Sequence, residues 1–345
     1  MLDSLHFLKN CYGDRTIIFI YGKQNFFNGS MAIIPIDLDG KATSGDVPSL
    51  DVVGILSEYL YVYVSRGDYW KSKESEASGT GSKRIHEKTL QGFDIKVPST
   101  QNEQRKIGSF FKQLDDTIAL HQRKLDLLKE QKKGYLQKMF PKNGANVPEL
   151  RFAGFAGDWE ERKLKEISDV RDGTHASPKY VSQGHPMVTS KNLTHSGLDM
   201  TDISFLTDED FNEINKRSKV SIGDILFGMI GTIGNPVIVD RDDFAIKNVA
   251  LIKEKTSNPI TNNWLLQYLK SPSFNRFIQK ENAGGTQKFI ALGLIRDMKL
   301  RVPEFDEQQQ IGNFFKQLDD TIARHQHKLE LLKDLKKGLS QQLFV

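Results

Sequence analysis

The amino-acid sequence predicts an α+β fold of mixed helices and strands, in which two globular domains are separated by two long helices that form an antiparallel coiled coil. Two observations carry most of this prediction. Residues 103–140 realign with residues 307–344 at a constant offset of 204, and 26 of 38 positions are identical, so this segment is duplicated. Within each copy, apolar residues recur at alternating spacings of four and three, which is typical of a coiled-coil seam.

The seam positions are expected to pair the two helices. They are Ile107, Phe111, Leu114, Ile118, His121, Leu125 and Leu128 in the first copy, and Ile311, Phe315, Leu318, Ile322, His325, Leu329 and Leu332 in the second. Asn102 and Asp306 are suitable N-caps, so we expect the helices to begin there. At roughly 1.5 Å per residue, each helix could extend about 50 Å and act as a spacer.

Two kinds of polar residue interrupt the apolar seam. His121 and His325 occupy the same position in both copies, either as a polar pair that fixes helix register or as half-exposed residues retained from the duplication. Lys132 and Lys336 also fall on the seam. Because a buried unpaired ammonium is costly, we expect these lysines to mark where helix pairing frays or where a partner subunit takes over.

A strand pattern precedes each helix. Residues 94–97 and 298–302 alternate apolar and polar side chains, and each stretch is followed by proline. Between the helices, residues 224–227 and 249–252 are predicted strands, while residues 263–280 predict a pair of helices broken at Pro272. The region between the helices therefore predicts one mixed domain.

The region before the first helix repeats this order with few identities. Residues 31–36, the run 56–64 and the loop 79–84 follow one another as their counterparts do in the second domain. The predicted boundaries are a first domain at 1–99, a helix at 100–140, a linker at 141–149, a second domain at 150–303 and a helix at 304–345. Up to the closing proline the first domain is 59 positions shorter, and we expect its N-terminal third to be absent.

Composition excludes several classes of protein. The chain has 345 residues, of which 38% are hydrophobic and 27% charged, and no apolar run approaches the roughly 20 residues of a membrane span. The start does not resemble a secretory signal. A lone cysteine, Cys11, excludes an internal disulfide framework and a cysteine-based zinc site. We therefore expect no membrane partner and a reducing cytoplasm as the location.

The net charge of +4 permits a nucleic-acid partner but does not require one. The sequence pI is near 8.8, whereas domains driven strongly to DNA often exceed 9.

Two motifs resemble cofactor sites without completing them. Gly228, Gly231 and Gly234 lack both the G-x-G-x-x-G spacing and a following P-loop lysine, so they predict a tight turn between strands. Residues 235–237 read Asn-Pro-Val and lack the aromatic residue that amino-methyltransferases place after Asn-Pro. Methyl transfer by this chain is not expected.

Nuclease and metal motifs are also incomplete. Residues 161–163 read Glu-Arg-Lys, but no Pro-Asp lies upstream, and the charged segment predicts a surface. His175, His185 and His195 are ten residues apart, which is not the spacing of helical metal ligands. We expect no catalytic residue and no metal site.

The arrangement of two dissimilar domains, each followed by a similar heptad helix, resembles the DNA-specificity subunit of type I restriction-modification enzymes. The resemblance covers nearly the whole chain. Its further motifs are Pro148-Glu149-Leu150-Arg151-Phe152 with Gly154, Phe155, Gly157 and Trp159; Gly223-Asp224-Ile225-Leu226 with Gly231-Thr232-Ile233-Gly234; and Gly284-Gly285-Thr286-Gln287-Lys288.

This resemblance implies a sequence-specific DNA-binding role without chemistry. Each target-recognition domain would read one half of a bipartite double-stranded DNA site, and the helices would hold the two domains at a set separation. Two methyltransferase subunits and restriction or translocase subunits would be the partners. S-adenosylmethionine, ATP and Mg²⁺ would belong to those partners, and this chain would hold no cofactor.

The chain departs from the family at its start. A full-length relative would begin its first domain with a segment like residues 148–159, and no copy precedes Met1. We expect either a truncated first domain that reads DNA poorly, or a missing portion supplied by another chain. Self-association through the truncated domain or the helices is therefore an open alternative.

Candidate DNA contacts are loop residues that can anchor phosphates or read base edges. In the second domain they are Arg171, Thr174, His175, Lys179, Tyr180, Ser190, Lys191, Asn192, Thr232, Gln287 and Lys288. In the first domain they are Ser82, Lys83 and Arg84, in the loop that corresponds to Gln287 and Lys288. The alternative for each is an ordinary exposed polar residue.

Three functions remain to be separated. The first is a specificity subunit for a bipartite site, and the second is a degenerate or silent fragment that assembles but reads one half-site or none. The third, a stand-alone nuclease or methyltransferase, is disfavoured by the missing catalytic constellation.

Overall fold

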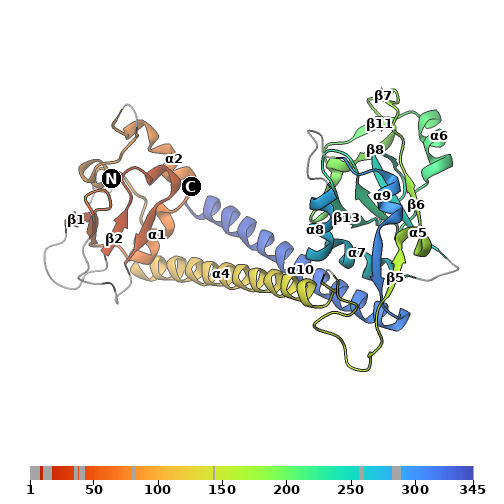
Figure 1. Ribbon diagram of the computed structural model, residues 1–345. Coiled ribbons are helices and arrows are strands. Elements are labelled where there is room, and N and C mark those ends of the chain that lie inside the picture. Colours follow the sequence, from red (N-terminus) through yellow and green to blue (C-terminus); the bar gives the residue numbers. More distant parts are fainter. Residues whose placement is uncertain are drawn as a thin grey trace. The chain divides into compact units, whose positions relative to one another are not determined.

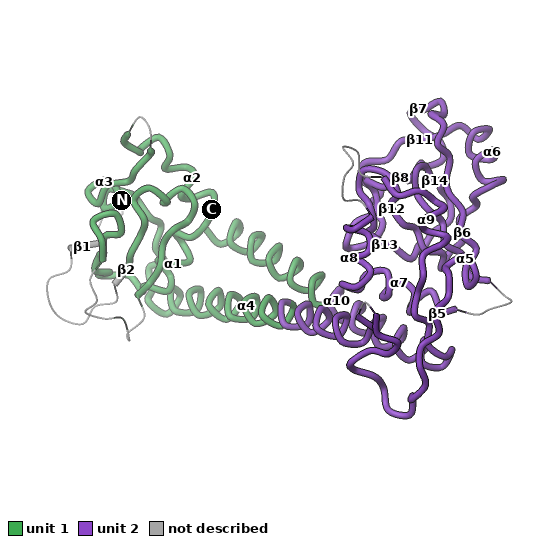
Figure 2. The backbone as a smooth tube through the Cα atoms, viewed as in Figure 1, with its two compact units in different colours: residues 1–125, 325–345 green, residues 126–324 purple. Residues whose placement is uncertain are grey.

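The computed structural model describes residues 8–10, 18–34, 38, 43–79, 82–142, 144–255, 260–281 and 289–344. The chain divides into two compact units (Figure 2). Unit 1 contains residues 1–125 and 325–345, and unit 2 contains residues 126–324. Both long helices contribute to both units.

Unit 1 is built on a four-stranded antiparallel sheet with the order β1-β4-β2-β3 (Figure 1). Its strands are β1 (Leu8–Asn10), β2 (Ile18–Tyr21), β3 (Met31–Ile33) and β4 (Ser49–Val52). Its helices are α1 (Ser57–Val64), α2 (Gly67–Ser72), α3 (Glu87–Gln91), the first part of α4 (Gln101–Lys138) and the last part of α10 (Phe305–Leu343), with short 3-10 turns at Phe26–Asn28 and Glu74–Glu76. An apolar core joins this sheet to α1 and to both long helices.

The described residues of unit 2 form two four-stranded sheets and two short ribbons. The first sheet has the order β13-β12-β15-β6, from β6 (Ser168–Asp172), β12 (Ile225–Gly228), β13 (Gly234–Ile238) and β15 (Val249–Glu254). The second has the order β14-β8-β11-β7, from β7 (Tyr180–Val181), β8 (His185–Thr189), β11 (Ser204–Leu206) and β14 (Ala245–Lys247). The ribbons are β5 (Glu160–Lys163) with β16 (Lys299–Val302), and β9 (Leu193–Thr194) with β10 (Gly197–Leu198).

In the described part of unit 2, six helices and the last part of α4 complete the unit. The six helices are α5 (Leu164–Ile167), α6 (Asp208–Ser218), α7 (Asn262–Lys270), α8 (Pro272–Glu281), α9 (Leu292–Asp297) and the first part of α10 (Phe305–Leu343), with a 3-10 turn at Ser190–Asn192. The predicted strands at 224–227 and 249–252 and the helix pair broken at Pro272 are confirmed. The three glycines from 228 to 234 border the turn between β12 and β13, as expected.

The first sheets of the two units share one topology. β1, β4, β2 and β3 lie in the same order as β6, β15, β12 and β13, and every neighbouring pair is antiparallel. α1 follows β4 as α7 follows β15. The duplication that is evident in the helices therefore extends to the globular parts.

The length difference between the units lies largely inside them. Seven residues, 11–17, separate β1 from β2, whereas 52 residues, 173–224, separate the corresponding β6 and β12. In unit 2 that connection carries β7 to β11 and α6. The shortening of unit 1 is therefore not confined to its N-terminal third.

Portions of α4 and α10 run antiparallel in each unit. In unit 1, Nδ1 of His121 lies 3.3 Å from Nδ1 of His325, and Lys336 donates to Asp115 at 2.5 Å. In unit 2, Lys132 donates to Asp319, also at 2.5 Å. These two residues are the equivalents of Lys336 and Asp115 in the other copy of the repeat, so the same ion pair occurs twice. The expectation that these lysines mark frayed pairing is wrong, because each ammonium meets a carboxylate on the opposite helix.

The helix starts and one strand differ from prediction. α4 begins at Gln101 and α10 at Phe305, one residue before the expected N-caps Asn102 and Asp306. Thr100 Oγ1 accepts from the Glu103 N–H at 3.2 Å and caps α4 instead. The strand predicted at 298–302 is confirmed as β16 (Lys299–Val302), but residues 94–97 form no strand and have no ladder partner among the described residues, so that prediction is wrong. A strand requires a ladder, and β16 obtains its ladder from β5.

A buried ion pair joins α10 to the segment that leads into unit 2, residues 148–163, which we call the leading segment. Arg151 donates from Nε and Nη2 to the two carboxylate oxygens of Glu307, at 2.6 and 2.7 Å. Trp159 Nε1 adds a third bond at 3.1 Å, and Glu307 is 0% exposed. The hydrogen bonds to Glu307 raise the pKa of Arg151. These contacts fix the leading segment against the start of α10.

Glycines permit α1 and α7 to approach the long helices. A Cβ at Gly108 would lie 2.9 Å from Glu58 Cβ and 3.0 Å from the Tyr59 nitrogen, and one at Gly312 would lie 3.0 Å from Asn263 Cβ and the Trp264 nitrogen. Contacts this short require the packed helices to separate.

Replacing Gly108 by alanine should lower the free energy of unfolding by about 1–2 kcal/mol through overpacking. The control is Gly134→Ala in the same helix, where nothing lies within 4 Å of the new Cβ. That change should raise stability by about 0.5–1 kcal/mol through helix propensity. Urea denaturation of the full chain measures both, and a gain at both positions would contradict the close packing of α1 on α4.

A second prediction concerns Lys270 at the end of α7. Burial lowers the pKa of Lys270 to about 8, Lys132 acts in the same direction, and Asp319 opposes them. An unfolded lysine titrates near 10.4, so the unfolded chain binds more protons between about pH 8 and 10.4, and stability rises with pH across that window.

Lys270→Met should therefore stabilise the chain at pH 7, by roughly 2 kcal/mol, and have little effect near pH 10.5. Urea midpoints at the two pH values are the measurement. An equal gain at both would show that the effect comes from packing and not from the buried charge.

Across the described residues, no helix is long and apolar enough to cross a membrane.

Candidate nucleic-acid interface

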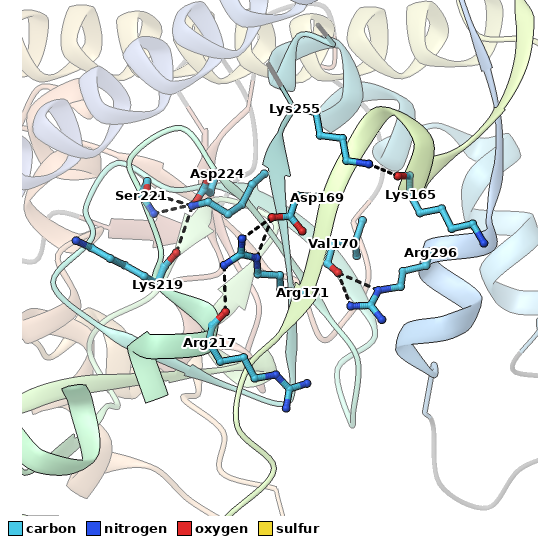
Figure 3. A network of polar contacts seen from close by, with 11 residues as sticks. Lys165, Asp169, Val170, Arg171, Arg217, Lys219, Ser221, Asp224, Lys255 and Arg296 are labelled. Atoms are coloured by element: carbon cyan, nitrogen blue, oxygen red, sulfur yellow. Dashed lines mark hydrogen bonds and ion pairs between the residues drawn. The ribbon is translucent and has the colours of Figure 1, made fainter. Parts of the chain in front are cut away.

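Strand β6, at the edge of its sheet, is anchored on two sides (Figure 3). Arg296 of α9 donates from Nε and Nη2 to the Val170 carbonyl, at 2.9 and 2.8 Å. Arg171 donates to Asp169 at 2.8 Å and to the Arg217 carbonyl at 3.3 Å, and the bond to Asp169 raises the pKa of Arg171. Arg171 is therefore engaged with the protein, which gives it a positioning role on the strand.

The turn between α6 and β12 is fixed by hydrogen bonds to a partly buried lysine, Lys253 (Figure 3). Lys253 donates to the Lys219 carbonyl at 3.2 Å, to Ser221 Oγ at 3.1 Å and to the carboxylate of Asp224. Asp224 in turn accepts from the Ser221 N–H at 2.7 Å. The loop that leads into β12 is thereby held rigidly beside β6.

A polar cluster forms where β6 ends. The Asp172 carboxylate, on a residue that is 5% exposed, accepts from Arg217 and lies 2.9 Å from His175 Nε2. The other ring nitrogen of His175 lies 2.8 Å from Asn248 Oδ1. These contacts tie the loop after β6 to the junction of β14 and β15.

Asn248 is the centre of this cluster. Its φ of 57° is left-handed, a conformation that asparagine tolerates better than most residues. Its N–H donates to the Thr174 carbonyl at 3.2 Å, and its carbonyl accepts from Ser190 Oγ at 2.9 Å. We call Asp172, Thr174, His175, Ser190, Arg217 and Asn248 the Asn248 cluster. It brings together three of the residues predicted to contact DNA: Thr174, His175 and Ser190.

Ser190 and Asn192 are buried, at 3% and 2% exposure. Asn192 accepts from the Thr189 N–H at 2.9 Å and donates to the carbonyls of Asp199 and Asp202 at 3.0 Å each. The side chains of both residues form hydrogen bonds within the protein, so both residues stabilise the 189–202 loop.

Four other predicted residues are exposed in unit 2: Lys179, Tyr180, Lys191 and Thr232. Tyr180 is 47% exposed on the edge strand β7, and Thr232 lies in the turn between β12 and β13. Lys191 contacts Asp202 at 2.8 Å, a pair in which both side chains are largely exposed. Exposed pairs of this kind are weak, so Lys191 can exchange its partner for a phosphate.

The predicted loop residues Gln287 and Lys288 lie outside the described residues. The described residues resume at Phe289, next to the turn between β12 and β13, because the Ile290 N–H donates to the Met229 carbonyl at 2.9 Å. In unit 1, Ile85 donates to the Lys23 carbonyl in the same way, at 3.1 Å. The loop with Ser82, Lys83 and Arg84 thus corresponds to the Gln287 loop. There Lys83 pairs with Glu74 at 2.5 Å and Arg84 with Asp46 at 3.6 Å.

Sequence reasoning missed Asp172, Arg217 and Asn248. Asp172 ends a strand and Asn248 stands between two apolar strands, which are positions where polar side chains gather at a sheet edge. That signal was present in the pattern, whereas the contribution of Arg217 from α6 depends on tertiary packing.

The three histidines spaced by ten residues do not converge. His185 pairs with Asp208 at 3.0 Å and stacks on Phe211 at 3.8 Å, whereas His175 belongs to the Asn248 cluster. Burial and then Lys270 lower the pKa of His195. Among the residues that the structure describes, no group of three or more acidic, histidine or cysteine side chains could hold a metal ion.

Comparison with known proteins shows which family the chain matches. The profile of the family described as "Type I restriction modification DNA specificity domain" matches residues 16–130 and 156–334. The type I restriction enzyme MjaVIII specificity subunit of Methanocaldococcus jannaschii is 23% identical over 311 residues, which cover 87% of this chain and 72% of that protein. The putative type I restriction enzyme MjaX specificity subunit of the same organism is 28% identical over 196 residues, covering 54% and 45%.

Solved structures share the fold. The S subunit of a type I restriction-modification system from M. genitalium superposes with a TM-score of 0.67 at 15% identity, covering 97% of this chain and 84% of that one. A chain from a structure of type I R-M complex assembly and conformational transition superposes with a TM-score of 0.54 at 18% identity, covering 96% and 82%.

Proposed function

Because this chain belongs to the type I restriction-modification DNA specificity family, we propose that it recognises a bipartite DNA site and docks methyltransferase and restriction subunits on it. Its curated relatives are named specificity subunits and the matching domain is a DNA specificity domain, so the chain is a non-catalytic subunit.

The Asn248 cluster is the observation that supports DNA reading by unit 2. It holds the ends of β6, β8 and β14 together, and the exposed donors Lys179, Tyr180 and Thr232 lie on the loops and the edge strand that leave this region. Rigid placement of exposed lysine and hydroxyl donors is what phosphate anchoring and base readout require.

The short connection in unit 1 favours the second candidate function, recognition of one half-site. The contacts proposed for unit 2 from Thr174 to Asn192 come from the 52-residue connection between β6 and β12, and the corresponding connection in unit 1 has seven residues. Ser82, Lys83 and Arg84 remain as candidate contacts there. Unit 1 would then anchor the DNA backbone more than it reads bases.

The helix pair supports the proposal of partner docking. Leu127 and Leu331 occupy equivalent positions in the two copies and are 57% and 55% exposed. Two equivalent apolar positions suit two copies of one partner, such as two methyltransferase subunits. We assign S-adenosylmethionine, ATP and Mg²⁺ to those partners, and we place the assembly in the cytoplasm.

The test uses the chain assembled with its methyltransferase subunit. Selection from random double-stranded DNA should return two short sequences at a fixed spacing, whereas a single short sequence would favour the second candidate function. Lys179→Ala should weaken binding to every sequence alike and reduce the salt slope by about one. Lys133→Ala, an exposed lysine of α4, is the matched control. Recovery of no motif would contradict DNA reading by this chain.

A further inference from the structure

We propose that unit 1 carries a docking surface for a segment of another polypeptide, of the same chemical kind as the leading segment of unit 2. That segment has an arginine and a tryptophan eight residues apart, followed directly by a β-strand. The surface consists of residues 94–97 and Glu103, which we call the acceptor edge.

The starts of α4 and α10 are built alike. Gln104 accepts from the Leu56 N–H at 2.9 Å and donates to the Pro98 carbonyl at 3.3 Å. Gln308, at the equivalent position, accepts from the Thr261 N–H at 3.1 Å and donates to the Pro303 carbonyl at 3.0 Å. Glu103 and Glu307 directly precede these glutamines. Because the two helices start in the same way, any difference between the surroundings of the two glutamates has another cause.

Those glutamates have opposite environments. Glu307 is fully buried and accepts from both Arg151 and Trp159. Glu103 is its counterpart at the offset of 204, and its residue is exposed. Within the described part of unit 1, no arginine or tryptophan donates to the Glu103 carboxylate. Unit 1 thus retains the acceptor of the anchoring contact.

The backbone next to Glu103 shows the same difference. In unit 2, β5 of the leading segment pairs with β16, and Leu300 at the centre of β16 is 1% exposed. The corresponding residues 94–97 form no ladder among the described residues, and Ile95, the counterpart of Leu300, is only half-buried. Such an edge can accept a strand by β-augmentation.

Charge decides which strand would fit. In unit 2, Lys163 lies opposite Lys299 and Glu161 lies opposite Arg301. The same register on unit 1 would place a residue like Lys163 opposite Asp94 and one like Glu161 opposite Lys96. Both pairs would be of opposite charge, which favours cross-strand pairing, so a strand of the type Glu-Glu-Arg-Lys suits the acceptor edge.

We commit to a second polypeptide as the occupant, since the strand at 160–163 of this chain is already paired with β16. A second copy of this chain has the same strand paired in the same way, so the occupant is a related specificity chain that presents an unpaired segment of this kind. No DNA is involved in this association, so its failure would leave the proposed DNA reading untouched.

A fluorescently labelled peptide of residues 145–164 is the probe, titrated into the full chain and followed by anisotropy. We expect saturable binding that Glu103→Gln weakens at least tenfold, through loss of charge-assisted bonds to the peptide arginine. The control Glu130→Gln, an exposed glutamate later in α4, should bind as the parent does. An Arg151→Ala peptide should bind at least tenfold more weakly.

Two outcomes would overturn the proposal. One is the absence of saturable binding to a chain whose thermal unfolding shows that it is folded. The other is binding that Glu103→Gln leaves unchanged, because the peptide would then be exchanging with the leading segment in unit 2 or binding elsewhere.

Discussion

Replacing Arg151 by methionine should lower the free energy of unfolding by about 3 kcal/mol, because it leaves the carboxylate of Glu307 buried without its cation. Glu307 is 0% exposed and receives two bonds from Arg151 and one from Trp159. Methionine retains most of the aliphatic volume of arginine, so the loss of stability comes from the missing positive charge and not from lost packing. Urea denaturation monitored by tryptophan fluorescence measures it.

A second substitution separates desolvation from packing. Arg151→Met combined with Glu307→Gln removes the unpaired charge and keeps an acceptor for Trp159, so it should recover more than half of the loss. The matched control is Arg162→Met, whose partner Glu160 is exposed, with an expected change below about 0.5 kcal/mol. Equal losses for Arg151→Met and Arg162→Met would show that the buried pair does not hold the leading segment.

Asn248→Ala should weaken sequence-specific DNA binding by the assembled complex about tenfold, since it releases His175 and the loop after β6. The same change places alanine at a φ of 57°, which adds a strain of about 1 kcal/mol to folding.

Asn248→Gly is the matched variant, because it keeps the backbone conformation and loses only the amide. It should lose DNA specificity as the alanine variant does while unfolding closer to the parent. Competition binding with specific and random duplexes, together with urea denaturation, gives both quantities. Full DNA specificity in Asn248→Gly would remove the Asn248 cluster from the recognition surface.

Local sequence patterns were sufficient for the elements whose stability is local. The 4-3 spacing predicted the two long helices, short apolar runs predicted β12 and β15, and Pro272 predicted the break between α7 and α8. The wrong predictions concern residues whose structure depends on a contact with a residue distant in the sequence. Residues 94–97 have the alternation of a strand but no ladder, and Lys132 and Lys336 find carboxylates that the seam pattern does not show.

The candidate site follows the same rule. The sequence placed polar residues after β6 and β8, but it could not show that Ser190 and Asn192 face inward or that Arg217 reaches Asp172. Those properties depend on how α6 and the second sheet pack on β6. The strand order shared by the two units was likewise invisible, because few residues are identical between them.

The most direct test of DNA recognition by this chain is a map of modified bases in DNA from cells that express it together with its methyltransferase subunit. We predict methylation confined to one defined sequence motif, with part of that motif altered or lost when Lys179, Tyr180 and Thr232 are replaced together. Methylation at the same motif in that triple variant, or no dependence of methylation on this chain, would contradict the account.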